Sequence, residues 1–314
     1  MRGRIDTHHH VYPPKYLTVA AEHIRQVTHV HFPRIQKWMP QQAIEAMDRD
    51  DIATAVLSLS APGVWFGNLA ATKRMARECN DYAAGLAHDH KGRFGVFAAL
   101  PLPGVEASLQ EIEYAFDVLK VDGVGLMTNY ENKWPGDATF APVFDELNRR
   151  KAVIYFHPTA AATFEGLVPD VPSPMIEFPF DTTRAIVSLL FSGTLFRCPD
   201  ARFIFSHGGG ALPVLAGRIE SIARNRPDLI ARAPNGTMHE LKRLYYDIAG
   251  VNHPIAFNAA RQLVGTSQLL FGTDFPFWSP QVAISGLDSF RLPASERRAI
   301  ERENAIGLMP QFNI

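Results

Sequence analysis

The sequence predicts an α/β protein, a (β/α)8 TIM barrel built as one domain over residues 1–314, with a lid-like insertion after the first strand. Short apolar stretches alternate with helical stretches along the whole chain, and eight of them have the length and composition of buried parallel strands. Polar residues suited to catalysis follow several of these strands, as they do at the carboxyl end of such a barrel. These observations favour a closed barrel over a doubly wound open sheet.

Composition limits the class of protein. The 314 residues are 46% hydrophobic, enough for one large core. The net charge is −1, from 31 basic and 32 acidic residues, which gives no reason to expect nucleic acid or an anionic membrane as a partner. Cys79 and Cys198 lack CxxC spacing, which favours a reducing compartment. With no apolar run of about 18 residues and a polar start, we expect a cytoplasmic protein.

The repeating pattern defines the expected elements in order. Strands are expected over residues 5–10, 53–60, 94–100, 123–127, 152–157, 202–207, 244–248 and 268–272. Helices are expected over residues 40–50, 69–90, 105–119, 141–150, 182–196, 211–224, 254–263 and 294–309. Residues 13–37, which include His23, His29, His31 and Phe32, have weak periodicity and are interpreted as a long loop that forms part of a lid. Residues 158–179 form a second long loop.

The first strand carries the strongest chemical signal. Side chains alternate across a strand, so His8 and His10 project to one face and His9 to the other. Two imidazoles about 7 Å apart along a backbone can converge on one divalent cation. A surface histidine cluster is the alternative interpretation, while three histidines are too few for a usual expression tag. The pattern therefore predicts that His8 and His10 bind a metal.

Other expected strands end in the same residue types. His157 ends strand 5, His207 ends strand 6, and Asp274 follows strand 8. Each alone is more often structural, but 12 histidines scattered at random would seldom place four at strand ends beside an aspartate. Three imidazoles and one carboxylate suit zinc and leave a coordination position open. His207, which precedes three glycines that allow close approach, is predicted to act as an acid or base there.

Loops after the strands carry side chains that could bind a substrate. Trp65, Phe178 and Phe277 could stack on a flat ring, although packing of the barrel rim explains each equally well. Further loop aromatics are Phe66, Tyr130, Trp134, Phe180 and Trp278. Anchors for a substrate carboxylate could be Arg184, Arg218 and Arg226, each of which is also explained as a surface or ion-paired residue.

Four motifs, taken together and in order, resemble a known family. They are Asp6-x-His8-x-His10, Tyr155-Phe156-His157-Pro158, Ser206-His207-Gly208-Gly209-Gly210 and Gly272-Thr273-Asp274-Phe275-Pro276-Phe277. This set, which spans nearly the whole chain, resembles the decarboxylase branch of the amidohydrolase superfamily. That branch includes the aminocarboxymuconate semialdehyde, gamma-resorcylate and methylsalicylate decarboxylases.

The resemblance implies a single amidohydrolase-type metal-dependent barrel domain with no organic cofactor. One divalent ion, zinc or alternatively manganese, would be bound by His8, His10, His157 and Asp274. His207 would be the catalytic histidine beside it. The resemblance also implies a homodimer in which Arg226 enters the site of the partner subunit.

The resemblance bears on the substrate as well. The muconate enzyme uses an arginine in the helix before strand 2, whereas residues 42–46 here contain none. A small hydroxybenzoate-like acid with one carboxylate therefore fits better than a dicarboxylate.

The expected reaction is that of a lyase, the non-oxidative decarboxylation of a small aromatic acid. Asp274 or His207 would deliver the proton to the ring, and the sequence does not choose between them. One alternative on the same barrel is metal-dependent hydrolysis of a lactone or amide with Asp274 as base. Another is a binding protein that has kept the ligands, since a barrel alone does not imply catalysis.

Overall fold

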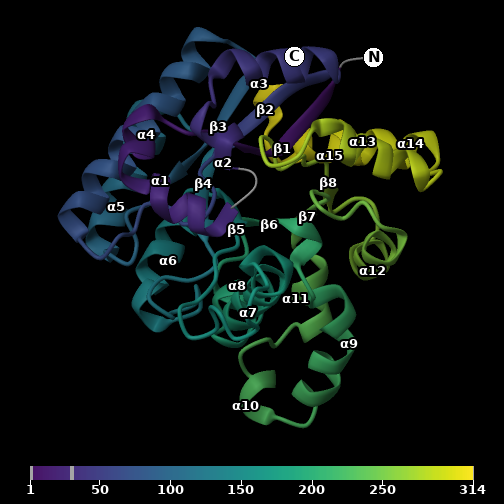
Figure 1. The fold of residues 1–314 in the computed structure, drawn as a ribbon. Helices are drawn as coiled ribbons and strands as arrows, with labels where there is room; N and C mark the ends of the chain where they lie inside the picture. The colour runs from purple at the N-terminus through teal and green to yellow at the C-terminus, as the bar shows by residue number, and fades with distance from the viewer. Residues whose placement is uncertain (1–2, 29–31, 314) are drawn as a thin grey trace.

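Eight parallel strands form one sheet, in which each strand pairs with the next along the chain. The computed structural model describes residues 3–28 and 32–313 (Figure 1). The strands are β1 (Arg4–His10), β2 (Ile52–Ser58), β3 (Phe94–Ala99), β4 (Gly123–Met127), β5 (Val153–His157), β6 (Arg202–Phe205), β7 (Tyr245–Asp247) and β8 (Leu269–Leu270). The predicted α/β fold with eight parallel strands is confirmed, in a near-closed barrel.

Backbone hydrogen bonds join the first strand to the last and bring the two ends of the sheet together. The amide of Thr7 donates to the carbonyl of Phe271 at 2.9 Å, and that of His10 donates to Phe275 at 2.8 Å. In the opposite direction the amide of Asp274 donates to the carbonyl of His8 at 2.8 Å. These bonds hold the segment after β8 against β1, so residues far apart in the chain meet at one rim.

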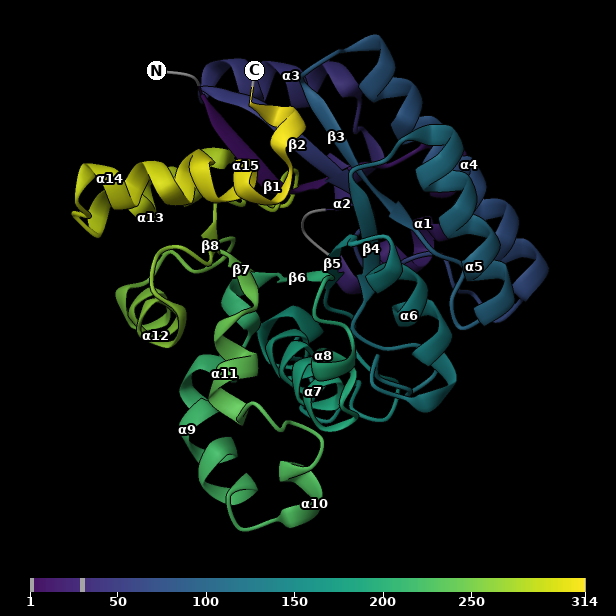
Figure 2. The same ribbon diagram turned by 180° about the vertical axis from the view of Figure 1, so that it is seen from behind.

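Helices surround the sheet on its outer side (Figures 1 and 2). The longer ones are α1 (Pro14–Thr28), α3 (Pro40–Arg49), α4 (Leu69–Asp89), α5 (Val105–Tyr114), α6 (Ala141–Arg149), α7 (Glu177–Phe191), α9 (Leu212–Ala223), α12 (Pro254–Val264) and α13 (Pro280–Ser289). Shorter ones are α2 (Phe32–Gln36), α8 (Thr194–Arg197), α10 (Pro227–Ile230), α11 (Thr237–Lys242), α14 (Ala294–Arg298) and α15 (Asn304–Leu308). Of the described helices, none is long and apolar enough to cross a membrane.

Residues 13–37 differ from the expected long loop, because α1 and α2 occupy most of them. Tyr16, Ala20 and Ile24 are fully buried at a spacing of four, which places them on one helix face. Apolar Leu17 and Val19 lie off this buried stripe, so the helical period is weak in the sequence. His29 and His31 lie outside the described residues.

Other helices also depart from expectation. α7 begins at Glu177 instead of residue 182, because Pro179 is tolerated in a first helical turn, where its missing amide costs nothing. The helices α10, α11 and α13 were not predicted. The closing helix is interrupted by a π-helical turn at Ala299–Glu303 between α14 and α15.

The interior of the barrel is filled by side chains, as is usual for this architecture. Its core is formed by Ile5, Val56, Phe97, Val153, Tyr155, Ile204 and Leu270. Ala305, Met309 and Phe312 from the C-terminal segment join the same cluster. The functional residues must therefore lie above this packed layer, at the carboxyl ends of the strands.

Candidate metal centre and active site

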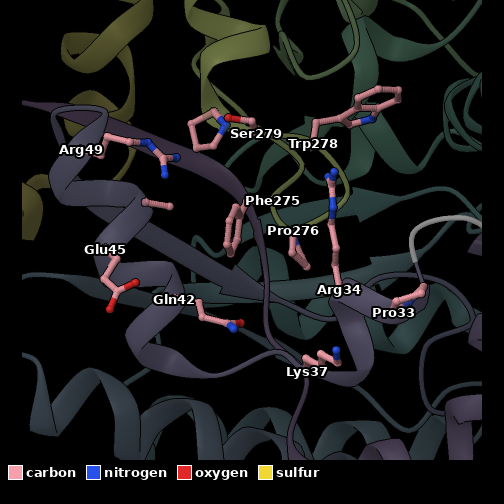
Figure 3. Close-up of a pocket in the computed structure, with 12 residues that line it drawn as sticks. Pro33, Arg34, Lys37, Gln42, Glu45, Arg49, Phe275, Pro276, Trp278 and Ser279 are labelled. Carbon is pink, nitrogen blue, oxygen red and sulfur yellow. The ribbon is translucent and has the colours of Figure 1, made fainter.

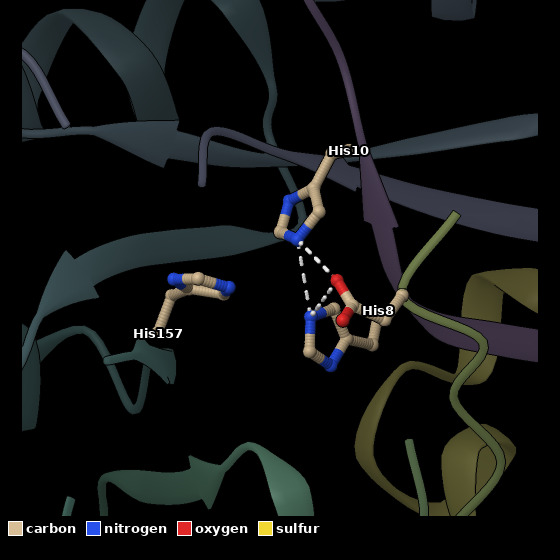
Figure 4. A group of neighbouring side chains, drawn as sticks. His8, His10 and His157 are labelled. Atoms are coloured by element: carbon tan, nitrogen blue, oxygen red, sulfur yellow. Dashed lines mark hydrogen bonds and ion pairs between the residues drawn. The ribbon is translucent and has the colours of Figure 1, made fainter. Parts of the chain in front are cut away.

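Four of the predicted residues meet in one cluster at that rim. His8, His10, His157 and Asp274 each offer one ligand atom, and these atoms all lie within 4.8 Å of one another. All four side chains are buried, with no more than 7% of any residue exposed. Figure 4 shows the three rings around a common point, with His8 and His10 on β1 and His157 at the end of β5. The structure thus brings together the set that the strand ends predict.

The hydrogen bonds of the three imidazoles determine which nitrogen faces the centre. His8 Nδ1 donates to Asp247 Oδ2 at 3.0 Å, and His10 Nδ1 donates to the carbonyl of Ser58 at 3.2 Å. His157 Nδ1 donates to the carbonyl of Pro158 at 2.9 Å. Because each Nδ1 meets an oxygen that can only accept, each neutral ring carries its proton there. The three Nε2 lone pairs are therefore left for the shared centre.

This donor set fits a divalent cation. The Nε2 atoms of His8 and His10 are only 3.1 Å apart, and both approach Asp274 Oδ1, at 3.3 and 3.0 Å. Two lone pairs at this distance repel each other unless positive charge lies beside them. Three imidazoles with one carboxylate are the ligands that zinc and similar metals prefer. The cluster is a buried His/His/His/Asp metal site.

The pKa values of the cluster point the same way. Burial alone would lower the pKa of His8, but the carboxylates of Asp247 and Asp274 raise it from 6.5 to about 10. Burial lowers the pKa of His10, and burial together with the neighbouring imidazoles holds that of His157 well below its usual value. The carboxylates therefore favour one positive charge at this point, while two of the rings stay neutral and able to bind a metal.

Asp274 remains an anion despite its burial. Burial alone would raise the pKa of this carboxyl, but the charge of His8 and hydrogen bonds from the imidazoles hold it well below its usual range. Its backbone has a φ of 60°, in the left-handed region that side-chain-bearing residues seldom adopt. Such strain is typical of functional positions.

His207 lies beside the four ligands without joining them. Its Nε2 is 3.4 Å from Asp274 Oδ2, and its Nδ1 is 3.2 Å from Ser206 Oγ. The side chain is 24% exposed, more than any of the four ligands, so it is the imidazole that a substrate could reach. Its φ of 53° begins a left-handed turn that continues through the three glycines.

Comparisons with known proteins agree with this geometry. The family model described as Amidohydrolase matches residues 5–310. The chain is 35% identical to the decarboxylase yanB of Aspergillus niger, over 99% of this chain and 88% of that protein. It is 32% identical to the 6-methylsalicylic acid decarboxylase of Penicillium expansum, over 99% and 97%. The chain belongs to the amidohydrolase family. Within it, the chain falls in the decarboxylase branch and is a carboxy-lyase.

A solved structure shares the fold of this amidohydrolase. The dihydroxybenzoic acid decarboxylase of Polaromonas, crystallised with manganese and the inhibitor 2-nitroresorcinol, superposes with a TM-score of 0.87. The match covers 100% of this chain and 98% of that one, at 22% identity.

Two of the four predicted substrate contacts lie at the metal site of this amidohydrolase. The ring of Phe178 is 6.3 Å from that of His157, and the ring of Phe277 is 5.5 Å from that of His10, measured between centroids. Trp65 is half-buried in the loop after β2, and within the described residues no ring contact joins it to the cluster.

Of the predicted basic anchors, Arg226 lies away from the cluster within one subunit. Arg226 is exposed and pairs with Asp228 at the start of α10, which Figure 1 shows far from β1. Arg184 stacks on the ring of Phe164 at 3.9 Å, and Arg218 is exposed on α9.

A separate hollow of about 580 Å³ lies between α2, α3 and the segment after β8 (Figure 3). Gln42 and Glu45 line it, together with Arg34 and Arg49. Residues 42–46, which contain no arginine, therefore face this hollow and not the metal site. None of the four metal-site residues is among the residues that line it.

Asp247 was not predicted from the sequence, and Asp6 entered the prediction only as part of the first motif. Asp247 ends β7 and holds His8, so the strand-end rule that found the other residues applied to it too. Asp6 is fully buried and accepts hydrogen bonds from His9 Nδ1 and from both the amide and the hydroxyl of Thr273. It therefore anchors the residue next to Asp274 onto β1.

Proposed function

We propose that this enzyme catalyses the metal-dependent, non-oxidative decarboxylation of a small hydroxybenzoate-like acid. The observation that carries the proposal is the buried cluster of three Nε2 atoms and one carboxylate with a reachable imidazole, His207, beside it. Relatives that align over nearly the full chain are named as decarboxylases, one of them of 6-methylsalicylic acid.

An aromatic substrate with a single carboxylate suits the surroundings of the cluster. The rings of Phe178 and Phe277 lie beside His157 and His10, where they could pack on a flat ring. The structural relative was crystallised with 2-nitroresorcinol, a flat phenol.

The reaction needs a place for the electrons of the breaking carbon–carbon bond. A bound divalent cation would supply charge stabilisation for the carboxylate or phenolate oxygen of the substrate. The ring carbon that bears the carboxylate accepts a proton, the carbon–carbon bond then breaks, and its electrons restore the aromatic ring as carbon dioxide leaves.

We assign delivery of that proton to His207. Asp274, the other candidate, is held as an anion by its imidazole neighbours, so it has no proton of its own to donate near neutral pH. His207 Nε2 is 3.4 Å from this carboxylate, which can accept the hydrogen bond that orients the ring.

We further propose that the ion is zinc, since three imidazoles and a carboxylate form a set that zinc prefers. Manganese is the alternative, because the Polaromonas enzyme was crystallised with it. The unpaired, buried Cys79 and Cys198 are consistent with a cytoplasmic enzyme.

Two larger features complete the proposal. Arg34 of α2 donates to the carbonyl of Phe277 at 3.3 Å, which supports the helical segment after β1 as a cover for the rim. The exposed Arg226 is proposed to act in a homodimer, where it would reach the substrate carboxylate bound to the partner subunit.

The test is a screen of ortho-hydroxybenzoates with zinc-loaded and manganese-loaded enzyme, scored by release of carbon dioxide. A chelator-treated sample of the same protein is the control. We expect release with at least one acid and none after chelation. If every acid stays intact while lactones gain the mass of one water, the enzyme is a hydrolase and the proposal is wrong.

A further inference from the structure

Asp247 is a fully buried carboxylate with two oxygens that serve different partners. Its Oδ2 accepts the hydrogen bond from His8 Nδ1 at 3.0 Å. Its Oδ1 accepts from the backbone amides of His207 and Ala249, each at 3.0 Å. The side chain of Asp247 thus contacts His8 of the metal site through Oδ2 and the backbone of His207 through Oδ1.

No arginine or lysine within residues 3–28 and 32–313 forms an ion pair with Asp247. A buried carboxylate without such a partner is costly, because it has lost its hydration. Besides the two backbone amides, the group that faces this carboxylate is His8, on whose other side the cation site lies. The charge of Asp247 therefore affects the metal site as well as the stability of the barrel.

The chain leaves room for this contact at Gly272, just after β8. A Cβ at this position would lie 2.9 Å from the Cβ of His8 and 3.0 Å from that of Asp247. Neither neighbour is the flexible end of a long side chain, so any side chain at residue 272 would push them apart. The absence of a side chain there lets His8 and Asp247 face each other across the rim.

The second contact acts on a strained backbone. His207 has a φ of 53°, and its amide points to Asp247 Oδ1. A left-handed residue with a side chain persists only when its surroundings hold it there. The hydrogen bond from the His207 amide to Asp247 is one such constraint. It fixes the backbone position from which the imidazole of His207 extends.

We propose that Asp247 is a positioning residue that couples the metal site to the catalytic histidine. Its Oδ2 fixes the tautomer and ring plane of His8, and its Oδ1 fixes the backbone of His207. The inference rests on the proposed function in one respect, the role of His207 as the acid. The part that concerns metal binding stands independently of the substrate.

The test is Asp247→Asn. An asparagine has one acceptor oxygen, so it can serve His8 or the two amides, but its NH₂ group then faces a donor on the other side. We expect the Zn²⁺ dissociation constant, measured by chelator competition without substrate, to rise about 10- to 100-fold. The visible absorption bands of the Co²⁺-loaded protein should shift, and kcat at saturating metal should fall at least tenfold.

Asp181→Asn is the matched control. Asp181 is equally buried and accepts hydrogen bonds from three side chains, Thr128, Asn129 and Trp134, none of which belongs to the metal site. This variant should lose thermal stability and keep the Zn²⁺ affinity within about twofold. Gly272→Ala, which separates His8 from Asp247, serves if Asp247→Asn does not fold, and should weaken Zn²⁺ binding similarly.

Each outcome decides part of the inference. Wild-type Zn²⁺ affinity in Asp247→Asn, or in Gly272→Ala where that variant replaces it, overturns the positioning of His8. Weaker binding with a wild-type kcat once metal is saturating overturns the link to His207. A wild-type enzyme that binds Zn²⁺ but decarboxylates nothing would refute the proposed function and leave the metal-binding result standing.

Discussion

Asp274 and His207 stand at adjacent places in the site but perform separable tasks. Asp274 shares one oxygen with His8 and His10 and directs the other toward His207. The Nε2 of His207 is hydrogen-bonded to the carboxylate of Asp274, and its ring packs edge-on against that of His8. Removal of each residue should therefore damage the enzyme in a different way.

Asp274→Asn should lose bound metal and turnover together, because an amide oxygen is a poorer ligand than a carboxylate. His207→Ala should keep its metal and lose turnover by at least ~100-fold, as expected for a general acid. Metal content by elemental analysis and carbon dioxide release measure the two effects. A His207→Ala enzyme with near-normal turnover would exclude this residue as the proton donor.

The turn that leads from β6 into α9 positions His207 by close backbone contacts. A Cβ at Gly210 would lie 2.1 Å from the carbonyl oxygen of Pro179, in the first turn of α7. Gly210 also has a φ of 65°. This glycine therefore sets how closely the turn after His207 approaches α7.

Gly210→Ala should lower the free energy of unfolding by about 2–3 kcal/mol, since both the contact and the backbone angle oppose a side chain. Gly217→Ala in α9 is the control, because nothing lies within 4 Å of its Cβ position. That variant should be neutral or more stable by about 0.5–1 kcal/mol. Equal stability of the two variants in urea denaturation would show that the turn adapts freely.

Helix α6 carries a charge cluster whose effect depends on pH. Hydrogen bonds from Arg149, opposed by partial burial and helped by Arg150, lower the pKa of Glu146 from 4.5 to about 2. A carboxyl with a depressed folded-state pKa stabilises the protein above its unfolded pKa and loses this effect as the pH falls through the folded value.

Glu146→Gln should therefore cost about 1 kcal/mol at pH 7, a figure reduced for solvent screening of the arginines. The difference from wild type should persist down to about pH 4.5 and vanish near pH 2. Denaturation curves at a series of pH values measure it. A difference that grows as the pH falls would contradict the assigned direction of the shift.

At the scale of the whole molecule, the position of Arg226 makes a prediction about assembly. It lies at the start of α10, which projects away from the barrel in both views (Figures 1 and 2). An arginine in this place can serve a metal site only in another subunit.

Arg226→Ala and His207→Ala homodimers should each be nearly inactive, while mixed dimers should recover turnover. In a mixed dimer, one site has its own His207 and receives Arg226 from its partner. Random mixing should restore about a quarter of wild-type activity, because half the dimers are mixed and each has one complete site. Mixed dimers that form, by mass spectrometry, but stay inactive would rule out the role in trans.

Much of the site could be predicted from local sequence. Alternation along a strand places His8 and His10 on one face, and the parallel barrel places His157, His207 and Asp274 at the same rim. Elements with weak local signals were harder: α1 buries a narrow stripe while other apolar residues lie off it, and α7 begins around a proline that the sequence marks as a break.

The sequence by itself determined which strand ends carry ligands, because side-chain alternation and strand order are properties of the local chain. Only the tertiary structure decided which nitrogen of each histidine faces the centre and that Asp247 joins His8 to His207. These features depend on hydrogen bonds between residues far apart in the chain, and no local pattern encodes the distances on which such bonds depend.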